Sequence, residues 1–187
     1  MILKKIKLNN IRSYEHQEIE FPLGSTLLSG DIGSGKTSIL LGIEFALFGL
    51  QPGQRGNSLL RNGAKEGSVE IEFEVEEKKI IIVRTLKRGK SITQDSCSLT
   101  VDNETREISV TELKNFVLDL LKYPSEFSKK QNLLYKFTVY TPQEEMKSII
   151  LEDPETRINT LRHIFGIDKY KRILENVSFV EGKIREE

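Results

Sequence analysis

Residues 30–37 read Gly30-Asp31-Ile32-Gly33-Ser34-Gly35-Lys36-Thr37 and match the pattern G-x-x-x-x-G-K-[ST]. Glycines at these positions let the backbone turn so that several N–H groups point inward and surround phosphate oxygens. The lysine of this pattern reaches the β- and γ-phosphates of a nucleotide, and the hydroxyl that follows it can bind Mg²⁺. The motif therefore predicts a P-loop, a binding site for the phosphates of a nucleotide.

The residues on either side of the motif predict the strand–loop–helix context of a P-loop. A short apolar run at 26–28 predicts a strand, and apolar residues fill much of 36–48, which predicts a largely buried helix. The positive N-terminal end of that helix would lie beneath the phosphates. The predicted fold class is therefore α/β, of the P-loop NTPase type.

The rest of the first 121 residues predicts several strands and one more helix. Alternating apolar and polar residues, together with β-branched runs, predict extended segments at 4–8, 18–21, 69–75, 79–85 and 98–101. Ser109 and Glu112 fit a capping box, and the amphipathic run through Leu121 predicts a helix.

Two helices are predicted near the C-terminal end. Asp153-Pro154 is a favourable pair for the start of a helix through Phe165, and Asp168 can cap another. Apolar residues then recur at intervals of three and four, at Tyr170, Ile173, Val177, Val180 and Ile184. This spacing predicts the start of a coiled coil, and because the pattern stops unfinished we expect the sequence to continue.

Composition excludes several classes of protein. Lys+Arg and Asp+Glu both number 28, so the net charge of 0 gives no reason by itself to expect a nucleic-acid partner. The single cysteine excludes a disulfide framework and a cysteine-type zinc site. No apolar run approaches the roughly 20 residues that span a bilayer, and the first residues lack a signal-peptide pattern. We therefore expect a cytoplasmic protein with no membrane partner.

A complete nucleotide hydrolase needs groups that this sequence lacks. An NKxD motif is absent, which argues against a GTPase, and so is a Walker B strand of four apolar residues ending in a carboxylate. Phe116-Val117-Leu118-Asp119 imitates Walker B, but it falls within an amphipathic helix in which Asp119 takes the polar face. We therefore expect this chain to hold only part of an active site.

The order of the motifs resembles the N-terminal half of the SMC-like ABC ATPases, and most closely the DNA double-strand break repair ATPases of the Rad-fifty and SbcC type. The resemblance is carried by the P-loop and by segments 6–14, 58–64, 139–145 and 165–168. It implies an ABC-type ATPase head lobe I with a mixed or antiparallel β subdomain at 1–167, and the start of an antiparallel coiled coil at 168–187. The signature motif and Walker B of such proteins belong to a C-terminal half, and a zinc hook is expected only in the full-length protein.

The resemblance also assigns roles to residues. It implies that ATP and Mg²⁺ bind here, with Lys36 and Gln143 acting in catalysis and with Thr37 and Gln143 contacting the metal. Ile32 stands where the family commonly has asparagine, so only its backbone can help to hold phosphate. The implied nucleotide-binding residues are Arg12, Gly30, Asp31, Ile32, Gly33, Ser34, Gly35, Lys36, Thr37, Ser38, Asn62, Gly63, Ala64 and Gln143.

The implied function is ATP hydrolysis in a nucleotide-sandwiched dimer of heads that controls a partner nuclease on DNA. The implied partners are the C-terminal half of the same ATPase, a second head, a nuclease of the Mre-eleven or SbcD type, and double-stranded DNA, in the cytoplasm and associated with the nucleoid. Two alternatives remain open: an SMC- or RecF-type ATPase of chromosome organisation or recombination, and a nucleotide-responsive coiled-coil scaffold.

A basic cluster offers a candidate contact with DNA. Arg84, Lys87, Arg88 and Lys90 surround Gly89 with no acidic residue between them. Basic hairpins bind phosphates in a salt-dependent way. A solvated strand edge that discourages aggregation explains the same residues equally well.

Overall fold

The computed structural model describes residues 1–50, 56–122, 151, 153–164 and 167–186. The chain divides into two units, Met1–Gln131 and Asn132–Glu187, and each is described by itself. Among the helices in these ranges, none combines the length and the apolar character that crossing a membrane requires.

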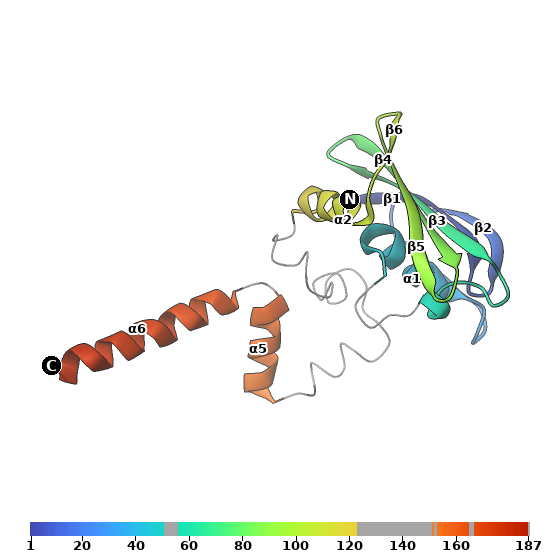
Figure 1. Ribbon diagram of the computed structural model, residues 1–187. Helices are drawn as coiled ribbons and strands as arrows, with labels where there is room; N and C mark the ends of the chain where they lie inside the picture. The colour runs from blue at the N-terminus through green and yellow to red at the C-terminus, as the bar shows by residue number, and fades with distance from the viewer. Residues whose placement is uncertain (51–55, 123–150, 152, 165–166, 187) are drawn as a thin grey trace. The chain divides into compact units, whose positions relative to one another are not determined.

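The amino-terminal unit is built on a six-stranded antiparallel sheet (Figure 1). Its strands are β1 (Ile2–Ile11), β2 (Tyr14–Glu20), β3 (Glu66–Val75), β4 (Lys78–Arg88), β5 (Ile92–Val101) and β6 (Glu104–Glu107). The spatial order is β2-β1-β3-β4-β5-β6, so β1 lies between β2 and β3. The connection from β2 to β3 therefore leaves the sheet and returns to it, and this excursion carries the P-loop.

One face of the sheet forms the apolar core. Ile6, Ile71, Ile82 and Leu99 are direct neighbours across β1, β3, β4 and β5, and all four are fully buried. Successive side chains on a strand point to opposite faces, so this row fixes which residues of each strand face inward. The alternation predicted for the strands at 4–8, 69–75 and 79–85 is confirmed.

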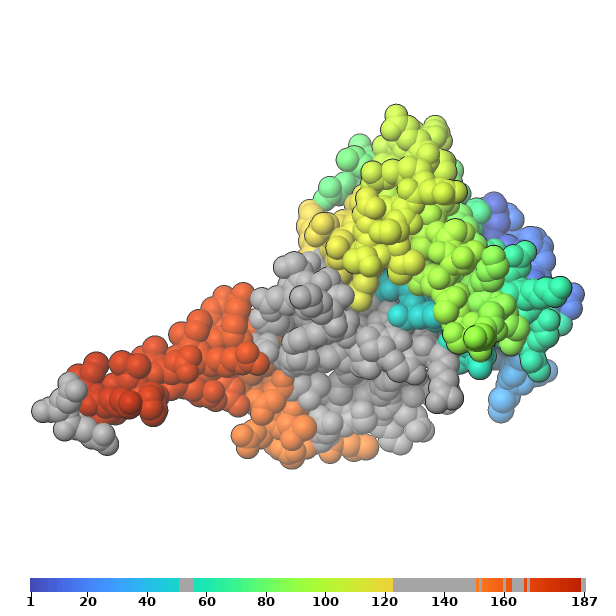
Figure 2. All heavy atoms as spheres, in the orientation of Figure 1, coloured from blue at the N-terminus to red at the C-terminus, as the bar shows by residue number. Residues whose placement is uncertain are grey.

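Two helices cover this inner face (Figure 1). The first, α1 (Lys36–Phe48), has the predicted bounds and contacts β1, β3 and β4. It approaches the sheet closely at Gly42, where a Cβ atom would lie 2.7 Å from Cδ2 of Leu8. The second, α2 (Val110–Leu120), contacts β5 and α1, and Ser109 Oγ accepts the Glu112 N–H at 3.2 Å, which confirms the predicted cap. In the space-filling view β5, β6 and α2 form the near surface of this unit (Figure 2).

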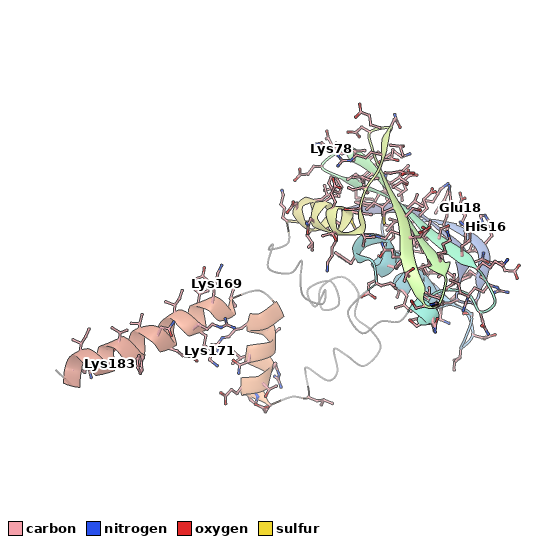
Figure 3. All side chains as sticks on the ribbon, in the orientation of Figure 1. His16, Glu18, Lys78, Lys169, Lys171 and Lys183 are labelled. Atoms are coloured by element: carbon pink, nitrogen blue, oxygen red, sulfur yellow. The ribbon has the colours of Figure 1, made fainter. Side chains whose placement is uncertain are left out.

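The outer face of the sheet is polar and carries ion pairs between neighbouring strands. Lys5 Nζ lies 2.6 Å from Glu18 Oε1 and 2.8 Å from Glu20 Oε1. The hydrogen bonds that Lys5 donates to both carboxylates raise the pKa of Lys5. The same hydrogen bond to Glu18 lowers the pKa of Glu18, which Figure 3 labels on β2. Because these pairs are solvent-exposed they contribute little to stability, and the buried inner face is the main source of it.

The structure differs from the predicted strands in two places. Residues 26–28 form no strand and pair with none of the described strands, and the side chain of Leu27 is 89% exposed. An apolar run forms a stable strand only when a neighbour supplies hydrogen-bond partners, and no described strand runs beside this one. Strand β6, which the sequence did not predict, is short and wholly exposed and is held by backbone pairing with β5.

The carboxy-terminal unit contains α5 (Pro154–Ile164) and α6 (Asp168–Glu186). Asp153 Oδ1 accepts the N–H groups of Glu155 and Thr156, both at 3.0 Å, which confirms the predicted N-cap. Figure 3 labels three lysines along α6. The predicted apolar seam of this helix is exposed to solvent. Its members are between 53% and 68% exposed: Tyr170, Ile173, Val177, Val180 and Ile184. A stripe with this exposure is typical of a helix that pairs with another helix, so the coiled coil stays a prediction.

Candidate nucleotide-binding site

The P-loop leads into the first turn of α1, and three glycines give it its shape. Gly30, Gly33 and Gly35 have φ angles of +147°, +87° and +96°, a region that other residues rarely adopt. Gly35 is also the N-cap of α1 and makes no side-chain hydrogen bond there. The positive end of the α1 dipole is therefore left without a capping side chain, which favours a bound anion.

The Lys36 ammonium is folded back onto the loop. Its Nζ donates to the carbonyl oxygens of Gly30 at 2.7 Å and Asp31 at 2.8 Å, and to Ser34 Oγ at 3.1 Å. These contacts hold the positive charge at the loop. An ammonium has three donors, so a phosphate oxygen can bind Lys36 only by replacing one of these partners.

A cavity of about 310 Å³ opens in front of the loop. Among the described residues, its lining carries two cationic side chains, Arg12 and Lys36, and no carboxylate. Positively charged side chains beside a helix N-terminus suit a polyanion such as the triphosphate of a nucleotide. The residues that line the cavity are Arg12, Ser13, Gly33, Gly35, Lys36, Thr37 and Ser38.

Arg12 reaches this cavity from the turn between β1 and β2. The backbone of Arg12 lies in the left-handed region, with φ of +50°, and its N–H donates to Leu59 O at 2.8 Å. Ile11, the last residue of β1, also forms an isolated antiparallel bridge with Leu60. Segment 59–60 thus fixes the turn, and the end of the first strand brings Arg12 to the cavity beside the P-loop. The contact of Arg12 with phosphate, which the family resemblance implies, stays a prediction.

Ser13 and Tyr14, which were not predicted as site residues, also lie beside the P-loop. A Cβ atom on Gly35 would lie 2.6 Å from Tyr14 Oη and 3.1 Å from Ser13 Oγ, and Tyr14 Oη donates to Ser34 O at 3.4 Å. Gly35 is therefore required both by its φ angle and by the close approach of the β1–β2 turn. The position of these residues beside Arg12 in the sequence was the available signal.

The remaining predicted residues fall into three groups. Gly30, Asp31, Ile32 and Ser34 belong to the P-loop but do not line the cavity, and the Ile32 side chain is fully exposed. Asn62, Gly63 and Ala64 lie in a separate loop that follows Arg61 and also stays outside the lining. Gln143 lies outside the described residues, so its role stays a prediction.

The donors present fit a magnesium ion only in part. Thr37 supplies a hydroxyl to the cavity, and no cluster of three or more His, Cys, Asp or Glu side chains occurs among the described residues. Asp119, the imitation of Walker B, is an exposed residue of α2, as predicted. A magnesium ion here would depend on Thr37, on phosphate oxygens and on water, as this ion commonly does beside nucleotides.

The basic cluster predicted to contact DNA is divided by the structure. Arg84 is fully buried, and its guanidinium donates to Ala46 O at 2.7 Å and to Leu47 O at 3.1 Å, at the C-terminal end of α1. Its inclusion in a DNA-binding surface is wrong. Lys87 and Lys90 remain exposed near the turn between β4 and β5.

A protein-family model and several known proteins match this chain. The model of the AAA domain family AAA_23 matches residues 5–186. The chain is 31% identical over 191 residues to the DNA double-strand break repair Rad50 ATPase of Methanococcus maripaludis, a match that covers 100% of this chain and 18% of the relative. It is also 31% identical over 169 residues to the Rad50 ATPase of Thermoplasma acidophilum, a match that covers 90% of this chain and 18% of that relative. The chain thus spans less than a fifth of the length of these relatives.

A solved structure supports the fold. The recombination mediator protein RecF with ATPrS, in the RecFOR pathway, matches with a TM-score of 0.50 at 19% identity, over 93% of this chain and 55% of that chain. At this identity the likeness concerns the fold alone, and it agrees with the P-loop ATPase lobe predicted from the sequence. The chain therefore belongs to the AAA domain family of ATPases matched by its sequence, and within that family it is similar to the Rad50 DNA double-strand break repair ATPases.

Proposed function

We propose that this chain is the ATP-binding N-terminal part of a DNA double-strand break repair ATPase, which hydrolyses ATP in a nucleotide-sandwiched dimer of heads and controls a partner nuclease on DNA. The observation that carries the proposal is the cavity in which Arg12, Lys36 and the N-terminal end of α1 converge. The similarity to Rad50 ATPases supports the choice of DNA repair over the other functions of P-loop proteins.

In this proposal each side chain has a distinct task. Lys36 exchanges its contact with a loop oxygen for the β- and γ-phosphates, and Arg12, from the β1–β2 turn, neutralises phosphate charge in the same cavity. Thr37 is one ligand of a magnesium ion. Gln143 orients the attacking water, a role that the family resemblance implies.

The proposal requires a C-terminal half for catalysis. Phosphoryl transfer to water needs charge stabilisation and metal ligands beyond a phosphate cradle, and the described residues offer no Walker B carboxylate. The run at 26–28, directly before the P-loop, pairs with none of the described strands and is a suitable site for strands from that half. The open apolar seam of α6 suits the returning helix of an antiparallel coiled coil, whose zinc hook would lie in the full-length protein.

The test of this function is ATP hydrolysis with and without the C-terminal half. We expect the chain alone to hydrolyse ATP at no more than background, and the assembled protein to show activity that rises more steeply than linearly with protein concentration, because two heads close around the nucleotide. Gln143→Ala should lower turnover more than ATP affinity. Robust turnover by the chain alone, abolished by Asp119→Asn, would contradict the proposal.

Double-stranded DNA and an Mre-eleven or SbcD type nuclease are the proposed partners, on the nucleoid in the cytoplasm. Replacing both Lys87 and Lys90 with glutamine should flatten the salt dependence of duplex binding by the assembled protein, because each phosphate contact releases counterions. Arg106→Gln, at an exposed position on β6, is the matched control. An unchanged slope would return the two lysines to the role of a solvated strand edge.

A further inference from the structure

The turn that carries Arg12 is held by a second arginine, which does not line the phosphate cavity. Arg61 Nη1 donates to Ser13 O at 2.7 Å, and Arg61 Nη2 lies 2.7 Å from Glu15 Oε1. The backbone N–H of Arg61 also donates to Asn10 O at 2.9 Å. Arg61 therefore contacts the turn on both sides of Arg12.

This turn needs such support because its backbone is strained. Asn10 and Arg12 have φ angles of +51° and +50°, and residues other than glycine remain in this region only where the surroundings hold them there. The bond from Arg12 N–H to Leu59 O is one restraint, and the contact of Arg61 with Ser13 O is the next. A planar guanidinium that binds a carbonyl and a carboxylate together fixes direction as well as distance.

Arg61 is itself anchored to the sheet. Arg88 on β4 donates from Nε to Ala64 O at 2.7 Å and from Nη2 to Arg61 O at 3.2 Å. The loop that begins at Arg61 is thus fixed to the end of β4, and Arg61 in turn holds the β1–β2 turn. The charge of Arg61 is paired with Glu15, so its contribution to the site is the geometry of the turn.

We propose that Arg61 is a positioning residue of the nucleotide site, which holds the β1–β2 turn so that Arg12 lies in the phosphate cavity and Tyr14 packs on Gly35. This inference rests on the proposed function, since it takes the cavity to be the site of the triphosphate. Arg61 does not touch the phosphates in this proposal, and it affects their binding only through Arg12 and the β1–β2 turn.

The test is a double-mutant cycle measured by calorimetric titration of the full chain with Mg·ATP. Arg61→Ala should weaken ATP binding by about threefold to tenfold, as expected for loss of a charge-assisted contact that acts indirectly. In an Arg12→Ala background the same substitution should have a clearly smaller effect, because the part of its effect that acts through Arg12 is gone. Arg61→Lys, a milder change, should show a similar loss because a lysine does not bind both partners in the same plane.

Two controls separate positioning from general damage. Arg106→Ala should leave ATP affinity unchanged, and thermal unfolding should show that the Arg61 variants remain folded. Hydrogen exchange at the Arg12 amide gives a readout without nucleotide, and it should be faster in Arg61→Ala than in the wild-type chain.

Additive losses in the cycle, or unchanged exchange at Arg12, would overturn the positioning role. If the wild-type chain bound no ATP, the proposed function itself would be refuted. If ATP bound and Arg12→Ala weakened it while Arg61→Ala did not, only the role of Arg61 would fail.

Discussion

Replacing Arg84 with methionine removes a buried charge from the C-terminal end of α1, the helix that follows the P-loop. The guanidinium lies on the inner face of β4 and donates to two carbonyl oxygens of α1, those of Ala46 and Leu47. Its third contact is with Cys97 Sγ, at 3.7 Å. Burial lowers the pKa of Arg84 to about 10, so the group is still charged at neutral pH.

The expected change in stability is a difference between opposing effects. Hydrogen bonds from a charged donor contribute about 1.5–3 kcal/mol each, and a cation at a helix C-terminus adds up to about 2 kcal/mol. Against this, the burial that lowers the pKa of Arg84 carries a penalty of about 3 kcal/mol. Methionine fills a similar volume without charge, so we expect Arg84→Met to lower the free energy of unfolding by about 1–4 kcal/mol.

The sign of the pH dependence follows from the lowered pKa. The unfolded chain binds the Arg84 proton more tightly than the folded chain, so the penalty is fully present below pH 10 and fades as pH rises above it. The difference between wild type and Arg84→Met should therefore be constant between pH 6 and 8.

Urea unfolding followed by circular dichroism is the suitable assay, since the chain contains no tryptophan. Lys87→Met is the matched control: it lies on the same strand, its side chain is 64% exposed, and it should change stability by no more than about 0.5 kcal/mol. If Arg84→Met were as stable as Lys87→Met, the buried contact would not hold α1 and the reasoning would be refuted.

Three further predictions concern the P-loop, a helix cap and the outer face. Gly35→Ala should lower the free energy of unfolding by about 1–3 kcal/mol and weaken ATP binding, because the residue has a positive φ angle and its Cβ would meet Tyr14; denaturation and ATP titration test this. Ser109→Ala should cost about 1 kcal/mol of unfolding free energy, measured in urea, through loss of the α2 cap. The hydrogen bond from Lys5 lowers the pKa of Glu18, so this contact should stabilise the fold above the ordinary glutamate pKa of 4.5 and stop doing so as pH falls through the lowered value. In Lys5→Met, the free energy of unfolding should therefore fall less on acidification than it does in the wild-type chain.

The sequence predicted most of the core because alternation and helical spacing report directly on burial. The strand at 79–85 and the helix at 36–48 were predicted in this way, and the structure confirms them. The same alternation contained the signal for Arg84, which follows Ile80 and Ile82 at intervals of two and precedes Leu86, all of them buried. The charge of Arg84 suggests an exposed side chain, but its position in the alternating pattern of the strand predicts burial correctly.

The candidate site was predicted where a local motif defines it and missed where distant segments meet. The P-loop pattern alone indicated Lys36 and Thr37, and family resemblance added Arg12, which lies in the same cavity. The contact of Arg61 with Ser13 joins residues 48 positions apart, and no local pattern in the sequence reports such a contact. Residues 26–28 were expected to form a strand because their apolar character was clear, but strand formation depends on a neighbour that local character does not specify.

The central claim is that the P-loop cavity binds the phosphates of ATP through Lys36, and calorimetric titration of the chain with Mg·ATP tests it most directly. We expect saturable binding by the wild-type chain and a loss of about tenfold to a hundredfold in Lys36→Ala, as a charge-assisted contact with phosphate is removed. Lys122→Ala, which removes an exposed ammonium paired with Glu76 at 2.6 Å, should bind ATP as the wild-type chain does. Equal affinities of the wild-type chain and Lys36→Ala would contradict the account.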